Sequence, residues 1–477
     1  MGYDFDVVVI GGGAAGLVAS KFAAGVGKRV ALIERSKLGG ECTLYGCVPS
    51  KTLIRTAKVL NQMNHAGDVG LDGCRALPVP GEAVLARVRR VVERVHEGHR
   101  PEVIERLGIH LIMGNPRFLD NHRIEVDGRL LSAASFVLCT GSSPSVPPIS
   151  GIETIPYLTN KTLFDMERLP RSVIVLGGGP IGIEMAQAFN YLGVRVTVLE
   201  LAERILTKED EELSDLLVRW LAGIGLVIRT GTRVRGLARK DDAIELTVED
   251  GTGRQDSVRG DAILVAVGRK ANVDTLDLEA AGVEYSPKGI KIDQKLRTTA
   301  RNIYACGDVA GPYQFSHMAE YQARIAAQNA LFPLRRSADY RHYVWCTFTD
   351  PEFAHAGLTE SEARERYGNN VRVYRWEFGD IDRAKTEADE FGMAKFICDR
   401  SYRLIGAHIL GPRAGDLIHE AQIIKTLGVP FHKLDSVIHV YPTFSEVTKQ
   451  PSKVSHIDKL RKSLLVRVAR RVFADRR

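Results

Sequence analysis

The sequence lacks an apolar stretch of membrane-spanning length, because glycine clusters or charges interrupt every long hydrophobic segment. Its first residues lack the basic region, apolar core and small-residue cleavage site of a secretory signal peptide. Only seven of the 477 residues are cysteine, and most of these are scattered, which excludes a secreted disulfide scaffold. These absences predict a cytoplasmic protein.

The sequence lacks a net positive charge outside one end of the chain. The formal net charge is +7, and residues 453–477 alone carry nine Lys or Arg and two Asp, so the rest of the chain is neutral. A neutral body excludes the broad basic surface that binds nucleic acid. Residues 459–477 place apolar residues at helical spacing among Lys and Arg. This pattern predicts a basic amphipathic tail that contacts an anionic membrane surface, caps a dimer or frays in solvent.

A glycine-rich turn follows the first predicted strand, residues 6–10. Gly11, Gly13 and Gly16 have the spacing GxGxxG, and a predicted helix and second strand follow and end at Glu34. Gly11 permits a tight turn, Gly13 lets a pyrophosphate approach the backbone, and Gly16 lets helix and strand pack closely. The helix N-terminus offers N–H groups to phosphates, and Glu34 can accept a ribose hydroxyl. The arrangement predicts a dinucleotide site in preference to a turn without a ligand.

The same pattern occurs again 166 residues later. Gly177, Gly179 and Gly182 repeat the GxGxxG spacing, and Glu200 follows the third glycine by eighteen residues, as Glu34 does in the first copy. Two such units predict two dinucleotide sites in one chain. A carboxylate at position 200 would repel a 2′-phosphate, so NADH is favoured and NADPH is less favoured, although Arg204 lies nearby.

Further candidate positions lie where other predicted elements end. Residues 50–66 and 82–107 are predicted to form two helices, and short strands lead into glycine or aspartate at several points. Asp308 ends one buried strand, where its carboxylate can accept a hydroxyl of the ribityl chain of a flavin or remain a solvated turn residue. The candidate cofactor contacts at these strand ends are Gly114, Thr140, Gly141, Ser142, Gly268, Asp308 and His317.

The only closely spaced cysteines come directly after the first nucleotide unit. Cys42 and Cys47 are five residues apart, and Lys51 follows one helical turn later. A nearby lysine lowers a thiol pKa, so the pair can form a redox disulfide. Two inert buried cysteines or a metal site fit the same spacing. The neighbouring dinucleotide unit favours the redox interpretation. Glu184, in the first turn of the second unit's helix, can point toward a nicotinamide and pair with Lys51.

With these motifs in place, the sequence resembles the FAD-dependent pyridine nucleotide–disulfide oxidoreductases, which include lipoamide dehydrogenase, glutathione reductase and mercuric reductase. The resemblance covers residues 6 to about 450. Cys139 precedes Thr140-Gly141 where the family usually has alanine, and residues 349–352 and 406–411 resemble the family's interface domain. The family pattern Gly-Gly-x-Cys-x4-Cys-x-Pro-x-Lys is matched by Gly39, Gly40, Cys42, Cys47, Pro49 and Lys51.

The resemblance implies an α/β fold with two Rossmann-like dinucleotide-binding domains, for FAD and NAD, and a C-terminal α+β dimerisation domain in a homodimer. The family relay, placed on matching residues, takes electrons from NADH to FAD and then to a Cys42–Cys47 disulfide. Cys47 would be the thiolate facing the flavin, Cys42 would attack the substrate, and Lys51 with Glu184 would tune the flavin. The implied segments are 1–150 and 271–338 for FAD, 151–270 for NAD(P)H, 339–455 for dimerisation and 456–477 for the basic tail.

One position departs from the lipoamide dehydrogenase pattern His-Pro-Thr-x-x-Glu, whose histidine, from the partner subunit, protonates the attacking thiol. Tyr441 replaces that histidine, whereas Glu446 matches the glutamate. Tyrosine has an ordinary pKa near 10, against about 6.5 for histidine, so it shuttles protons poorly at pH 7. His439 lies about 6.5 Å away on an extended segment and can substitute only if the chain bends. Tyrosine near this site is typical of mercuric reductases, but their C-terminal cysteine pair is absent.

The sequence therefore predicts an NADH-dependent FAD enzyme that reduces a small disulfide or a thiol-reactive metal ion and holds no resident metal. Two alternatives stay open. One is an NADH oxidase that reduces oxygen at the flavin and does not need Cys42 and Cys47. The other is a non-catalytic component docked to a membrane or to a multienzyme complex through the basic tail.

Overall fold

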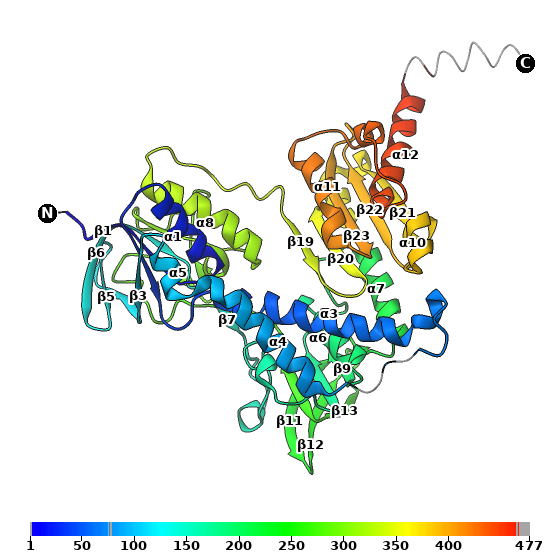
Figure 1. Cartoon of the computed structure of the whole chain (residues 1–477), viewed down its shortest axis with the longest axis horizontal. Coiled ribbons are helices and arrows are strands. Elements are labelled where there is room, and N and C mark those ends of the chain that lie inside the picture. The colour runs from blue at the N-terminus through cyan, green and yellow to red at the C-terminus, as the bar shows by residue number, and fades with distance from the viewer. Residues whose placement is uncertain (1, 75, 77–78, 464–465, 467–477) are drawn as a thin grey trace, which may run out of the picture.

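The computed structural model describes residues 2–74, 76, 79–463 and 466. Figure 1 shows three α/β parts, with the N-terminal sheet on the left, the second nucleotide unit at the bottom and the C-terminal domain at the upper right. The predicted fold class is therefore confirmed.

The N-terminal part is built on a seven-stranded sheet in the order β3-β2-β1-β6-β5-β4, with β18 also paired to β6. β1, β2, β3, β18 and one end of β6 run parallel, and β5 and β4 continue antiparallel. Residues 7–9 are almost fully buried, because helices cover one face of the sheet and residues 271–290 pack against the other. The strands are β1 (Phe5–Ile10), β2 (Val30–Glu34), β3 (Ile109–Met113), β4 (Pro116–Phe118), β5 (Arg123–Val126), β6 (Arg129–Leu138) and β18 (Ile303–Ala305).

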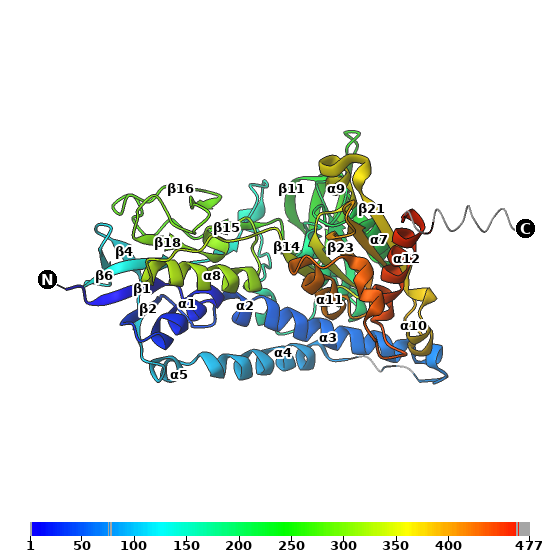
Figure 2. The same cartoon turned by 90° about the horizontal axis from the view of Figure 1, so that it is seen from above.

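Two helices pack side by side on one face of this sheet, α1 (Ala14–Gly25) and α8 (Ser316–Leu331). A short helix α2 (Gly40–Leu44) follows β2, and the long helix α3 (Cys47–Asn64) begins at the second cysteine of the pair. Figure 2 shows α3 running beside α4 (Gly81–His96) from the N-terminal part toward the C-terminal domain. Cys42 therefore lies in α2, and Cys47 begins the long helix that runs toward the C-terminal domain.

The single helix predicted over residues 82–107 is wrong. Helix α4 ends at His96, a 3-10 turn covers Glu97–His99, and α5 (Pro101–Glu105) starts anew. The backbone of Arg100 is extended, with ψ 151°, because the proline ring at position 101 disfavours a helical conformation in the preceding residue. The spacing of apolar residues alone does not predict this break in the helix.

The second nucleotide unit has a four-stranded parallel sheet in the order β10-β9-β8-β14. Helix α6 (Pro180–Tyr191) follows β8 and α7 (Glu211–Gly223) follows β9. A three-stranded antiparallel sheet extends from this unit. The strands are β8 (Ser172–Leu176), β9 (Arg195–Leu199), β10 (Val227–Arg229), β11 (Arg233–Lys240), β12 (Ala243–Glu249), β13 (Gln255–Gly260) and β14 (Ala262–Val265).

The C-terminal domain is a five-stranded antiparallel sheet in the order β19-β20-β23-β22-β21 with helices packed on it. The strands are β19 (Val344–Thr347), β20 (Glu352–Gly357), β21 (Arg372–Glu377), β22 (Met393–Cys398) and β23 (Leu404–Gly411). The helices are α9 (Glu360–Tyr367), α10 (Asp382–Glu387), α11 (Ala414–Thr426) and α12 (Glu446–Lys462).

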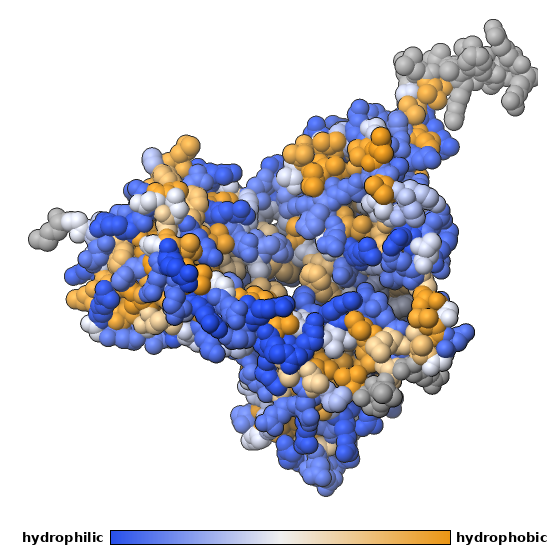
Figure 3. All heavy atoms as spheres, in the orientation of Figure 1, coloured by the Kyte–Doolittle hydropathy of each residue, from blue (hydrophilic) through white to orange (hydrophobic). Residues whose placement is uncertain are grey.

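Apolar side chains gather on the surface of this domain, as Figure 3 shows over the region of α11 and α12. Leu427 is 71% exposed, Val440 76% and Ile438 97%. Apolar residues gathered in this way are typical of a surface that another protein covers. This observation agrees with the predicted homodimer.

The predicted amphipathic tail, residues 459–477, lies mostly outside the described residues, since α12 ends at Lys462. Across the described part of the chain, we find no helix that combines the length and the apolar composition needed to cross a bilayer.

Candidate active site

A cavity of about 1440 Å³ lies where the three parts meet. The N-terminal part contributes the first glycine turn and the cysteine pair, the second nucleotide unit contributes the start of α6, and the C-terminal domain contributes β19. The cavity therefore brings together both predicted nucleotide sites and the predicted redox pair.

The two glycine turns leave open space at corresponding positions. A Cβ atom on Gly13 would meet only the Cα of Gly40, at 3.7 Å, and one on Gly179 would meet nothing within 4 Å. Each of these glycines precedes a helix, and neither helix has a side-chain cap, so its first N–H groups are available to a ligand. These features fit the pyrophosphates of two dinucleotides.

The two glutamates at the ends of β2 and β9 make equivalent contacts. Glu34 Oε2 accepts a hydrogen bond from the Gly12 amide at 2.7 Å, and Glu200 Oε2 accepts one from the Gly178 amide at 2.5 Å. Each carboxylate therefore accepts a hydrogen bond from the middle of its own glycine turn. The two nucleotide units, which share a sequence pattern, thus also share this hydrogen bond in the structure.

Most predicted cofactor positions lie on the cavity wall, and the others do not. Gly114 and Gly268 are not lining residues themselves, but Asn115 and Arg269 beside them are. The predicted residues that line the cavity are Gly11, Gly13, Glu34, Cys42, Cys47, Lys51, Thr140, Gly141, Ser142, Gly179, Glu184, Asp308 and His317. Those outside the lining are Gly16, Gly114, Gly177, Gly182, Glu200, Gly268, Tyr441 and Glu446.

Cys47 Sγ lies 3.6 Å from Ser316 Oγ, and the interaction between the two thiols moves the pKa values of Cys42 and Cys47 in opposite directions. The pKa of Cys47 falls to about 6 because hydrogen bonds from Cys42 and Ser316 and the charge of Lys51 outweigh burial and Glu184. The pKa of Cys42 is raised by its hydrogen bond to Cys47 and by burial. Cys47 is therefore the thiolate and Cys42 the thiol when the pair is reduced at neutral pH.

Lys51 and Glu184 form the ion pair that the sequence predicts. Lys51 Nζ lies 2.7 Å from Glu184 Oε2 and 4.5 Å above the ring of Phe348. The Phe348 amide donates to Glu184 Oε1 at 2.8 Å, which fixes the carboxylate. Burial alone would lower the pKa of Lys51, but the Glu184 carboxylate outweighs it and raises that pKa. A permanent positive charge is thus held at the cavity wall beside the Cys47 thiolate.

Asp308 is held by Ser142, a predicted cofactor contact, and by Arg269, which the sequence did not predict. Ser142 Oγ donates to Asp308 Oδ2 at 2.6 Å and accepts from Arg269 Nε at 2.7 Å. Arg269 also pairs with Glu41 at 3.1 Å, next to Cys42 in the chain. Arg269 follows Gly268 at the end of a predicted strand. This position was the only signal in the sequence that Arg269 belongs to the site.

A second group that the sequence did not predict surrounds Glu209, which lines the cavity and is only 3% exposed. Its carboxylate accepts from Trp345 Nε1 at 2.7 Å and lies 3.1 Å from His355 Nδ1. Burial raises the pKa of Glu209 to about 7. These partners come from β19 and β20, so they come together only when the C-terminal domain packs on the second nucleotide unit.

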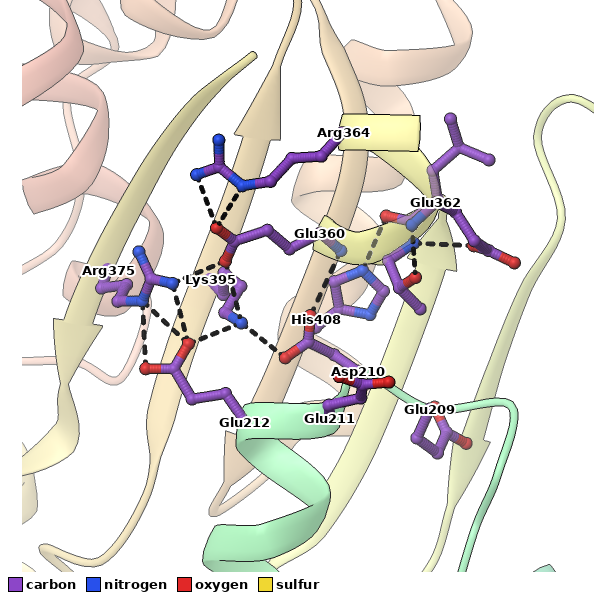
Figure 4. Close-up of polar contacts among 12 residues, drawn as sticks. Glu209, Asp210, Glu211, Glu212, Glu360, Glu362, Arg364, Arg375, Lys395 and His408 are labelled. Atoms are coloured by element: carbon purple, nitrogen blue, oxygen red, sulfur yellow. Dashed lines mark hydrogen bonds and ion pairs between the residues drawn. The ribbon is translucent and has the colours of Figure 1, made fainter. Parts of the chain in front are cut away.

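The residue next to Glu209 belongs to a buried ionic cluster, drawn in Figure 4. Lys395 Nζ, from β22, lies 2.6 Å from Asp210, 2.6 Å from Glu212 and 3.2 Å from Glu360. The side chains of Lys395 and Asp210 are each 2% exposed. The cluster fixes the start of α7 to the C-terminal sheet and so positions the loop that carries Glu209.

The residues near the departure from the family pattern lie away from this cavity. Tyr441 is 66% exposed and donates from Oη to Asp382 at 2.9 Å. His439 uses both ring nitrogens within its own domain, at 2.6 Å from Glu420 and 2.9 Å from the Val437 carbonyl. Position 441 therefore presents a phenol, and both ring nitrogens of the neighbouring His439 contact acceptors of their own domain.

Comparison with known families decides where the chain belongs. The family described as pyridine nucleotide-disulphide oxidoreductase matches residues 5–323, and its dimerisation domain matches residues 343–451. The chain belongs to the pyridine nucleotide-disulphide oxidoreductase family. The predicted family is thereby confirmed, and the matched dimerisation domain supports a homodimer.

Individual relatives of this oxidoreductase cover almost the whole chain. It is 33% identical to a mercuric reductase of Staphylococcus aureus, over 94% of this chain and 81% of that protein. It is 34% identical to a dihydrolipoyl dehydrogenase of Thermus scotoductus, over 95% and 97% of the two chains. The solved flavoprotein disulfide reductase RclA of Escherichia coli, as a Cu(II) complex, is similar with a TM-score of 0.85 and 29% identity. That match covers 95% of this chain and all of the RclA chain.

Membership establishes the coarse activity of the oxidoreductase. The chain is an NAD(P)H-dependent flavoprotein disulfide oxidoreductase, and FAD and a pyridine nucleotide are its cofactors. The open glycine turns and the uncapped helices described above fit both groups.

Proposed function

We propose that this protein passes electrons from NADH, through FAD and the Cys42–Cys47 pair, to a thiol-reactive metal ion such as Hg(II) or Cu(II). The observation that carries the proposal is the tyrosine at the position where the lipoamide dehydrogenase pattern has its proton-donating histidine. Tyr441 occupies the histidine position, and His439 is bonded to Glu420. The likeness to mercuric reductases and to the Cu(II) complex of RclA supports the same choice.

The proton balance of the two candidate reactions explains why the missing imidazole matters. Reducing a disulfide with NADH consumes one proton from solution, because two thiols form and each needs a proton. Reducing Hg(II) to Hg(0), or two Cu(II) to two Cu(I), releases one proton and leaves no protonated product. A tyrosine at the position of the family's proton-donating histidine therefore suits the metal better than the disulfide.

In this proposal, the residues on the cavity wall have different roles in electron transfer. Bound FAD supplies the step that converts hydride transfer from the nicotinamide into electron transfer to a disulfide. Lys51, held by Glu184, provides a positive charge beside the cysteine pair, and Cys47 provides the stable thiolate. Cys42 keeps its proton more strongly and is the thiol that meets the substrate. An incoming metal ion displaces that proton when it binds sulfur.

Tyr441 and Glu446 would act from the partner subunit in this proposal. Tyr441 lies on an exposed turn of the dimerisation domain, where the family resemblance places the residue that reaches the other subunit's cysteine pair. Its phenol oxygen, tied to Asp382, can serve as a polar ligand to a metal held by Cys42. Glu446, which accepts from Gln450 at 3.4 Å, would position this segment.

The test begins with anaerobic reduction of the enzyme by NADH. Lipoamide, glutathione disulfide, Hg(II) and Cu(II) are then added separately, and the return of the oxidised flavin absorbance is timed. We expect a metal ion to reoxidise the enzyme faster than either disulfide, with one proton released per NADH in weak buffer. Faster reoxidation by a disulfide, with proton uptake, would contradict the choice of substrate.

The variant Cys42→Ser separates this proposal from its alternatives. We expect it to bind FAD and accept electrons from NADH but to reduce no metal. Oxygen uptake that equals the wild-type rate of NADH consumption would support an NADH oxidase instead. Binding of the chain to liposomes without any NADH-linked turnover would support a docked, non-catalytic component.

The finer cofactor and location assignments belong to the same proposal. Glu200 at the ribose position favours NADH, and the two nucleotide sites lie on one cavity with the cysteine pair. A reduced pair near neutral pH suits the reducing cytoplasm. Deleting residues 456–477 and measuring binding to anionic vesicles tests the proposed membrane contact of the basic tail.

A further inference from the structure

A second pair of cysteines lies in the wall of the same cavity. Cys139 directly follows β6 and Cys306 directly follows β18, two parallel strands on which Leu138 lies opposite Ala305. The Cys306 amide donates to the Leu138 carbonyl at 3.0 Å and holds the strand ends side by side. The two sulfur atoms are 3.4 Å apart.

The surroundings of this pair connect it to the predicted FAD site. Both residues line the cavity, although Cys139 is only 6% exposed and Cys306 is fully buried. A Cβ on Gly11 would lie 2.4 Å from the Cys139 carbonyl oxygen, so the first glycine turn rests directly on this strand end. The hydrogen bond to Cys306 and burial raise the pKa of Cys139, which keeps its thiol protonated.

We propose that Cys139 and Cys306 form a second disulfide when a peroxide enters the cavity, and that bound FAD shields them. One thiol reduces hydrogen peroxide, giving a sulfenic acid and one water. The other thiol then attacks that sulfur, and a second water leaves as the S–S bond forms. Two thiols thus lose two electrons and two protons, and one peroxide becomes two waters. The raised thiol pKa makes this reaction slower than oxidation of Cys47.

Closing the bond would disturb the turn that holds the FAD pyrophosphate. A disulfide needs sulfur atoms about 2.05 Å apart, so the present 3.4 Å separation must shorten by about 1.4 Å. The turn has no room to absorb this movement, since a Cβ on Gly16 would lie 1.7 Å from Gly11 O and 3.5 Å from Cys139 Cβ. We expect the oxidised form to bind FAD about tenfold more weakly, from local strain of the size that off-rotamer side chains carry.

The first measurement detects the bond. The full-length chain with Cys42→Ser and Cys47→Ser, folded by circular dichroism, is prepared at low and at saturating FAD and exposed to hydrogen peroxide. Alkylation after unfolding and peptide mass spectrometry should show Cys139 linked to Cys306 at low FAD, and several-fold less at saturation. Cys398, also fully buried, is the internal control and stays alkylated. Full alkylation of Cys139 and Cys306 at low FAD would overturn the proposal.

The second measurement tests the consequence for FAD. Flavin fluorescence titration compares the peroxide-treated chain before and after dithiothreitol, and we expect about a tenfold difference in dissociation constant. Cys139→Ala, which restores the residue usual in the family, should abolish the difference, whereas Cys398→Ala should keep it. Equal FAD affinity of the oxidised and re-reduced chains would overturn the proposed coupling. Neither readout uses metal reduction, so the result is independent of the proposed substrate.

Discussion

Replacing Lys395 with methionine tests how the C-terminal domain is fixed to the second nucleotide unit. Methionine keeps much of the side-chain volume and removes the ammonium group that faces Asp210, Glu212 and Glu360. Asp210, with a side chain only 2% exposed, would then be a buried carboxylate beside two others, with Arg375 as the neighbouring cation. Breaking a buried ion pair in this way costs about 3–5 kcal/mol.

An exposed ion pair of the same length provides the control. Lys270 Nζ also lies 2.6 Å from a carboxylate, Asp274, but both side chains are more than half exposed. Such pairs contribute about 0–1 kcal/mol because water screens them. The free energies of unfolding of Lys395→Met and Lys270→Met are compared by urea titration of the FAD-saturated protein at pH 7. A loss in Lys395→Met no larger than in Lys270→Met would refute the reasoning.

The pH dependence gives the same prediction a second readout. The folded pKa of Lys395 is raised, since its carboxylate partners outweigh burial, so its contribution is present below its unfolded pKa and lost at strongly alkaline pH. The folded pKa of Asp210 is lowered because neighbouring cations outweigh burial, so its contribution is present above its ordinary pKa and lost in acid. The stability difference between wild type and Lys395→Met should therefore be full at pH 7 and shrink in acid, first as Asp210 is protonated in the variant and then as it is protonated in wild type. Adding Asp210→Asn to Lys395→Met should recover part of the loss at pH 7.

Three further predictions concern the cavity. In the NADH-reduced enzyme, the thiolate of Cys47 should appear as the pH rises through about 6, measured by iodoacetamide reactivity, and Cys47→Ser should abolish this step. Lys51→Met should slow anaerobic flavin reduction by NADH about 100-fold because Glu184 is left without its cation, and Lys51→Arg should restore part of the rate. Glu200→Gln keeps an acceptor for the turn but removes the charge, so the ratio of kcat/KM for NADH over NADPH should fall at least about tenfold. An unchanged ratio would refute the role of Glu200.

The parts of the site that follow from local sequence could be predicted. The strand, glycine turn, helix and acid of each nucleotide unit lie within one short segment, and their spacing reflects the backbone geometry of that segment. Gly13, Gly179, Glu34 and Glu200 accordingly lie where the pattern indicates. The positive charge near Cys47 could also be predicted, because Lys51 lies one helical turn away on α3.

The parts that depend on contacts between distant segments could not be predicted. Glu209 meets Trp345 and His355 across 136 and 146 residues of chain, and no periodicity encodes such a meeting. Lys395 has no local signal for burial, because a lysine in a strand is usually exposed until a partner from another domain covers it. The break before Pro101 was in the sequence, but the apolar pattern on both sides concealed it.

The sequence by itself determined that this protein carries two dinucleotide units, a cysteine pair beside the first, and a tyrosine in place of a histidine near its end. Each of these is a property of residues close together in the chain. Only the tertiary structure decided that the three parts share one cavity, that Ser316 contacts Cys47, and that His439 is already bonded to Glu420. It also placed Cys139 against Cys306, because two strands far apart in sequence end side by side in one sheet.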